Sequence, residues 1–150
     1  MTEEEWFATD DLHAMCRHLG FRPHTRKLRL VLIAAMRRHK IKDRRCVWAI
    51  ESAVLSGTHP ARNAEFADLL REIAGNPFRP VPFSSAWRTD TAVSLARGMY
   101  ELRDFGAMPI LADALQDAGC DSDDILSHCR DAKQTHVRGC WVVDLVLGKT

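Results

Sequence analysis

Apolar residues recur at helical spacing through most of this chain, and glycine, proline or capping residues separate one apolar segment from the next. In the stretch from 89 to 103, Val93, Ala96 and Met99 follow one another at intervals of three residues. Such intervals place side chains on one face of a helix. No run alternates between apolar and polar residues over the length of a strand. The pattern predicts an all-α fold, a compact bundle of seven or eight short helices.

The first residues carry a recognisable helix start. Thr2 and Glu5 have the spacing of a capping box, so we expect a short helix that carries Trp6 and Phe7 inward. Asp10 is the expected cap of a second helix, which ends at a glycine.

Six further segments have helical patterns, and each is bounded by stop or start signals. The segment at 26–39 is apolar around most of its circumference, and its basic end suits the negative pole of the helix dipole. The expected helices cover 26–39, 43–56, 61–74, 89–103, 107–118 and 121–130.

One loop stands out, at residues 75–86. It contains three prolines that alternate with Phe78, Val81 and Phe83. Because proline favours extended backbone on both sides, we expect an extended segment whose aromatic side chains hold it against the helices.

Length and composition favour one soluble domain spanning 1–150. A chain of 150 residues with 46% hydrophobic and 27% charged residues is large enough for a core and too apolar for disorder. No apolar run reaches the roughly 20 residues that cross a bilayer. The acidic start is unlike a signal peptide, so we expect a cytoplasmic protein with reduced thiols and no membrane association.

The net charge of +1 hides two charged segments of opposite sign. Ten Lys and Arg residues and one acid lie between Arg22 and Arg45, whereas eight acids and two strong bases lie between Glu101 and Asp131. The basic segment 22–45 raises nucleic-acid binding as an alternative function. However, its charges flank an apolar helix, and few aromatic side chains are near for base stacking, so this function is not favoured.

Thiol and imidazole side chains gather near the carboxyl end, at Cys120, His128, Cys129, His136 and Cys140. These are the side chains most often used as zinc ligands or as nucleophile and base. The segment 136–147 that contains the last two can be a helix or a strand. A helix starting at 136 puts His136 and Cys140 on one stripe, whereas a helix starting after Gly139 does not.

Three interpretations of this cluster compete. A structural zinc site would use Cys120, His128, His136 and Cys140; a helix allows only one of His128 and Cys129 to face the ion. A thiol hydrolase would use Cys140 or Cys129 as nucleophile, His136 or His128 as base, and Asp144 to orient the base. Free cysteines are usually small core residues, however, and this third interpretation is favoured, with no cofactor and no catalysis.

Several stretches resemble an uncharacterised family of small bacterial proteins that occurs as many paralogues in planctomycete-type genomes. They are MTEEEW at the start, RKLRL at 26–30, GNPFRPV at 75–81, LADALQDAGC at 111–120, HCR at 128–130 and HVRGCWVVDLVLGK at 136–149. The LADAL stretch and Gly119 are also similar to a motif of the bacterial repeat-companion domain. The chain departs from the family at 36–45, where Met36 and His39 flank the paired arginines. The resemblance implies a helical accessory or interaction module and assigns no catalytic residue.

The sequence therefore favours a non-catalytic helical module that binds a partner protein. Charge segregation without an identifiable catalytic set motivates this hypothesis. We expect two contact surfaces, a basic rim and a polar elbow. The basic rim is Arg37, Arg38, Lys40, Lys42, Arg44 and Arg45; the polar elbow is His128, Arg130, His136 and Arg138.

Overall fold

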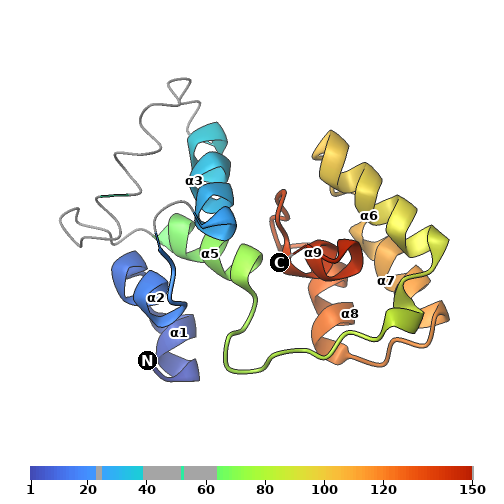
Figure 1. Ribbon diagram of the computed structural model, residues 1–150, viewed down its shortest axis with the longest axis horizontal. Helices are drawn as coiled ribbons and strands as arrows, with labels where there is room; N and C mark the ends of the chain where they lie inside the picture. The colour runs from blue at the N-terminus through green and yellow to red at the C-terminus, as the bar shows by residue number, and fades with distance from the viewer. Residues whose placement is uncertain (23–24, 39–51, 53–63, 150) are drawn as a thin grey trace. The chain divides into compact units, whose positions relative to one another are not determined.

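The structure is a computed structural model that describes residues 1–22, 25–38, 52 and 64–149 (Figure 1). The described residues form helices, turns and loops, and they contain no β-strand, which confirms the all-α prediction. The chain divides into two compact units, Met1–Phe78 and Arg79–Thr150, called unit 1 and unit 2. A single domain over the whole chain stays a prediction.

Unit 1 begins with the predicted capping box. The Thr2 hydroxyl accepts a hydrogen bond from the Glu5 amide at 3.2 Å, and the Glu5 carboxylate accepts one from the Thr2 amide at 2.8 Å. These bonds start helix α1, Glu3–Ala8. Trp6 is fully buried as expected, but Phe7 is 55% exposed, so its predicted inward position is wrong. A helix of six residues buries only one narrow stripe, and its next residue lies about 100° away.

Helix α2, Leu12–His18, is capped by Asp11 and not by the predicted Asp10. The Asp11 carboxylate accepts a hydrogen bond from the Ala14 amide at 3.1 Å, while its own amide donates to the Thr9 hydroxyl. Asp10 and Asp11 are both suitable N-cap residues, and Asp11 takes this position because α2 begins at the next residue, Leu12.

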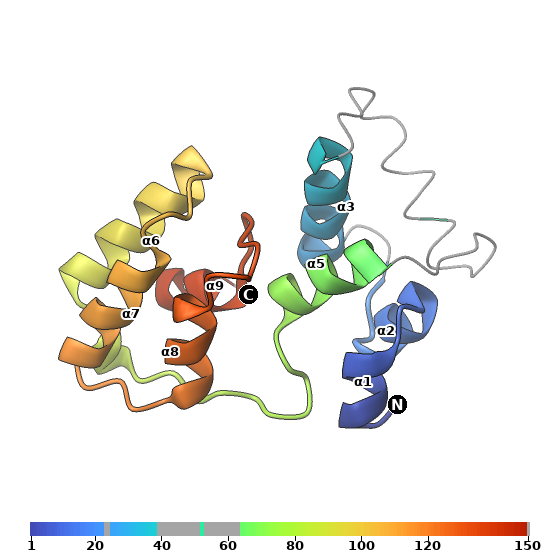
Figure 2. The same ribbon diagram turned by 180° about the vertical axis from the view of Figure 1, so that it is seen from behind.

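Helices α3, Arg26–Arg38, and α5, Ala64–Ala74, pack side by side in unit 1 (Figures 1 and 2). The buried residues of α3 are Leu28, Val31, Leu32, Ala35 and Met36, and those of α5 include Ala67, Leu69, Leu70 and Ile73. Helices are therefore present within the segments expected at 26–39 and 61–74, and each buries one apolar face. Apart from residue 52, the helix expected over 43–56 lies outside the described residues.

The proline-rich stretch separates two α-helices as predicted, contains a turn at residues 77–78, and ends in a short 3-10 helix, η1, Ser85–Trp87. Phe78 stacks on His18 in unit 1, with ring centroids 4.7 Å apart. Phe83 meets Trp87 edge to face at 5.3 Å and packs against the core of unit 2.

Unit 2 consists of η1 and four α-helices that surround one apolar core (Figure 2). Its helices are α6 (Asp90–Leu102), α7 (Met108–Asp117), α8 (Asp123–Arg130) and α9 (Trp141–Leu147). Helix α7 packs on α6 and α8, and α9 packs on α6 and α8. The core side chains include Met99, Leu111, Leu115, Ile125 and Val143. Ile110 is 58% exposed, because the buried face of α7 is set by Met108, Leu111, Ala112 and Leu115.

No described helix has both the length and the apolar character needed to cross a bilayer. The longest ones, α3 and α6, have 13 residues each.

Candidate functional site

The cluster of imidazole and thiol side chains is assembled by the end of α8, the following loop and the start of α9. His128 lies in the last turn of α8, a helix with acidic residues in its first turn and basic residues in its last, as the helix dipole favours. The terminal segment is a helix, but it begins at Trp141, after Gly139. His136 therefore lies in the loop, and the one-stripe arrangement of His136 and Cys140 is not formed.

The loop nevertheless returns His136 to Cys140. A tight turn closes where the Cys140 amide donates to the Val137 oxygen at 2.9 Å. Gly139 has a φ of +101° in this turn, a conformation that a side chain would strain. Cys140 then serves as the N-cap residue of α9. A turn, rather than helical periodicity, thus brings the two side chains together.

His128, His136 and Cys140 meet within unit 2 at ligand-like distances. His128 Nε2 lies 3.2 Å from Cys140 Sγ, within hydrogen-bond range for sulfur. One nitrogen of each imidazole and the thiol sulfur all lie within 4.8 Å of one another. The two imidazole rings are edge to face with centroids 5.0 Å apart, and the Trp141 ring is 5.1 Å from that of His128. Cys140 is fully buried, while both histidines are half-buried.

Three of the four residues of the predicted zinc set are in this cluster, and Cys120 is not. Cys120 follows α7, where its amide donates to the Leu115 oxygen, and its side chain is buried in the core of unit 2. Cys129 is also in that core. Because adjacent helical residues diverge by about 100°, His128 faces the cluster while Cys129 faces the interior, as the sequence predicted.

The thiol-hydrolase interpretation finds an imidazole in contact with a thiol, but the sulfur is not accessible to a substrate. An imidazole beside a thiol is the pairing that activates a nucleophilic cysteine. A working thiolate also needs an exposed sulfur, and Cys140 has no exposed surface. Asp144, the proposed orienting carboxylate, is buried on α9 one turn beyond Cys140.

The polar elbow is engaged in contacts inside unit 2. Arg130 donates to Asp113 and Gln116, each at 2.7 Å. The guanidinium of Arg138 lies 4.3 Å from the centroid of the Tyr100 ring, and the ammonium of Lys149 lies 4.9 Å from it. Such cation–π contacts were missed in the sequence, because nothing local links residues 100, 138 and 149.

Only the first two residues of the basic rim are described. Arg37 and Arg38 are exposed at the end of α3, and Arg38 forms an ion pair with Glu65 at 2.6 Å. Lys40, Lys42, Arg44 and Arg45 lie outside the described residues.

All eight acids between Glu101 and Asp131 are exposed, and we call residues 101–131 the acidic segment. It also exposes two large apolar side chains, Leu102 (80%) and Ile110 (58%). The acids are Glu101, Asp104, Asp113, Asp117, Asp121, Asp123, Asp124 and Asp131.

Comparison of the chain with protein-family models, with curated proteins and with solved structures finds no match to any of the three.

Proposed function

We propose that the chain is a non-catalytic helical module that binds a basic partner protein through its acidic segment. The observation that carries the proposal is the exposure of Leu102 and Ile110 among eight exposed carboxylates. Protein interfaces commonly combine apolar anchors with a charged rim. The carboxylates would speed encounter with a basic partner and exclude acidic ones, while the apolar side chains would contribute affinity.

Burial supports the non-catalytic part of the proposal. The strongest pairing of base and nucleophile in the described residues, His128 with Cys140, has its sulfur enclosed. Substrate access would need local opening of the start of α9, which costs the burial of Val142 and Val143.

The basic rim and the polar elbow remain part of the proposal as secondary surfaces. In the elbow, Arg130 and Arg138 already contact other residues of unit 2, so they offer less to a partner than the acidic segment does. In the rim, Arg37 and Arg38 are exposed and could meet an acidic region of the same partner.

Nucleic acid is the less favoured partner. The middle of α3 buries Leu28, Val31 and Leu32, so its cations sit at the helix ends. Arg38 is also paired with Glu65. A gel shift at low salt checks this alternative, since binding through phosphates is strongest there. A shift that disappears at high salt would favour it.

The remaining proposals rest on the sequence. The motifs at 111–120 and 128–149 support membership of the bacterial paralogous family described above. We keep the cytoplasmic location as a proposal, and the described cysteines are buried and form no disulfide.

The partner proposal is tested by photo-crosslinking from position 110 in cells of the source organism. We expect one discrete crosslinked protein with a basic surface. A crosslinker at position 97, which is exposed on α6 outside the acidic segment, is the matched control and should give no such product. Reversing Asp113 and Asp117 to lysine should abolish the product from position 110. Equal products from both positions, or a product that survives charge reversal, would contradict the proposal.

A further inference from the structure

We infer that His128, His136 and Cys140 form a zinc-binding site within unit 2. The site is separate from the proposed partner contacts of the acidic segment, because its donor side chains are not among the exposed carboxylates, Leu102 or Ile110. Two imidazole nitrogens and one sulfur converge here from a helix end, a loop and a helix start. No other group of three or more such side chains within one unit meets at this spacing among the residues that the structure describes.

The distances match those of a metal site with little adjustment. Tetrahedral zinc with Zn–N bonds near 2.0 Å and Zn–S bonds near 2.3 Å separates its donor atoms by about 3.3–3.6 Å. The 3.2 Å between His128 Nε2 and Cys140 Sγ is already close to that separation. The whole set spans at most 4.8 Å, so the third donor, on His136, needs to move by about 1 Å. His136 lies in a loop, where such a shift is least costly.

The donor set selects the class of metal. A thiolate and two imidazoles suit Zn²⁺ or Co²⁺ and disfavour Mg²⁺ and Ca²⁺, which take oxygen donors. The three side chains would leave one tetrahedral position for water or another donor. Burial of Cys140 favours a structural role for the ion, because a buried sulfur is protected from oxidation and exchange.

The position of the site also suggests what the ion would stabilise. Helix α9 has only seven residues, yet it contributes Val142, Val143 and Val146 to the core of unit 2. A short helix is marginal alone and depends on its tertiary contacts. An ion held by His128 and Cys140 would tie the N-cap residue of α9 to the end of α8.

Packing alone is the competing explanation for the same contacts. The hydrogen bond between His128 and Cys140, the edge-to-face rings of His128 and His136, and the Trp141 ring beside His128 would stabilise the junction without a metal. Replacement of a histidine by phenylalanine separates the two explanations, because it keeps a ring and removes the donor nitrogens.

The test uses the full chain, purified without chelators, with elemental analysis and Co²⁺ titration followed by visible absorption. We expect close to one equivalent of zinc, and a tetrahedral Co²⁺ spectrum with a thiolate charge-transfer band. His136→Phe and Cys140→Ala should each weaken Co²⁺ binding at least tenfold. Cys120→Ala and Cys129→Ala are matched controls, since both residues are buried cysteines of unit 2 outside the cluster, and they should bind Co²⁺ as the parent does.

A second measurement covers variants that fold poorly. Removal of zinc from the parent protein by a chelator should lower the midpoint of thermal unfolding and speed hydrogen exchange in α9, and added Zn²⁺ should restore both. Less than about 0.1 equivalent of zinc together with no Co²⁺ spectrum would overturn the inference, because structural zinc is near-stoichiometric. Equal loss of Co²⁺ binding in the Cys129→Ala control would overturn it as well.

Discussion

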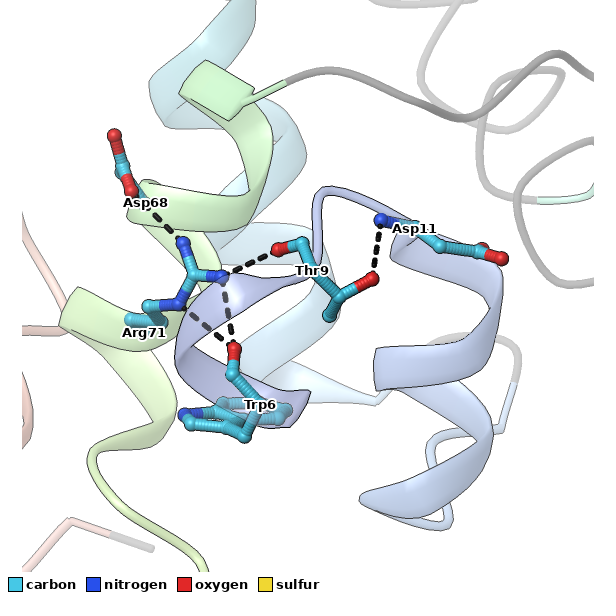
Figure 3. Close-up of polar contacts among 5 residues, drawn as sticks. All are labelled: Trp6, Thr9, Asp11, Asp68 and Arg71. Carbon is cyan, nitrogen blue, oxygen red and sulfur yellow. Dashed lines mark hydrogen bonds and ion pairs between the residues drawn. The ribbon is translucent and has the colours of Figure 1, made fainter. Parts of the chain in front are cut away.

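The guanidinium of Arg71 donates two hydrogen bonds to the main-chain oxygen of Trp6, a residue 65 positions earlier in the sequence (Figure 3). The donor–acceptor distances are 3.2 Å from Nε and 2.8 Å from Nη2. The same side chain also donates to the Thr9 oxygen and pairs with Asp68 at 2.9 Å. Arg71 on α5 therefore satisfies carbonyl groups at the end of α1, which the helix itself leaves unpaired.

Replacement of Arg71 should destabilise unit 1. Each hydrogen bond from a charged donor contributes about 1.5–3 kcal/mol, so we expect Arg71→Ala to lower the free energy of unfolding by about 2–3 kcal/mol. Arg71→Lys should recover part of that loss, because one ammonium does not reproduce the fork of donors. Urea unfolding followed by tryptophan fluorescence measures both variants.

Arg29→Ala is the control for Arg71→Ala. Arg29 is exposed on α3, so its removal should change the free energy of unfolding by less than about 0.5 kcal/mol. Equal effects of the two substitutions would show that the carbonyl contacts of Arg71 contribute nothing specific.

A second arginine holds the end of α9. Arg88 donates to the Leu145 oxygen from Nη2 at 2.9 Å and from Nε at 3.3 Å, and its guanidinium lies 5.2 Å from the centroid of Phe83. Because the side chain is exposed, Arg88→Ala should lower the free energy of unfolding by only about 1 kcal/mol. Hydrogen exchange in the last turn of α9 should increase in this variant and not in Arg97→Ala, which removes an exposed arginine of α6.

Arg103 occupies a backbone conformation that glycine would adopt at less cost. Its φ is +58°, and its amide donates to the Met99 oxygen at 2.8 Å to close the end of α6. Left-handed backbone costs most residues about 1–2 kcal/mol, part of which glycine loses again through its freedom in the unfolded chain. We therefore expect Arg103→Gly to raise the free energy of unfolding by about 0.5–1 kcal/mol.

Replacement of arginine by glycine six residues earlier, at Arg97, should lower the free energy of unfolding. Arg97→Gly removes the same charge from the interior of α6, where glycine costs about 1 kcal/mol. Thermal unfolding of the two variants side by side gives the difference. A decrease for both would indicate that the Arg103 side chain contributes more than its backbone conformation costs.

Local patterns predicted the helices of this chain well, because helix starts and stops depend on neighbouring residues. The capping box at Thr2 and the stop at Gly119 after α7 are decided within a few positions. The orientation of single side chains was less predictable: Phe7 and Ile110 lie beside the buried stripes of their helices. Which of two adjacent apolar residues faces the core depends on the helices packed against it.

The residues of the candidate site could be predicted from the sequence, but the way in which they come together could not. Residue type alone marked His128, His136 and Cys140. Their meeting depends on the turn at Val137–Cys140, which helical periodicity does not describe. Contacts between distant segments, such as that of Arg71 with Trp6, could not be predicted from the neighbouring residues in the sequence.

Burial of Cys16 should make the stability of unit 1 fall at high pH. This thiol lies on α2 with 2% of its surface exposed, and burial raises its pKa to about 12 from an ordinary value of 9.0. Between pH 9 and 12 the folded chain keeps this proton while the unfolded chain releases it, so the folded state binds more protons and loses stability as pH rises. Cys16→Ala should flatten the decrease in urea midpoint over that range. Parallel pH profiles for the variant and the parent would mean that Cys16 ionises in the folded chain as it does in water.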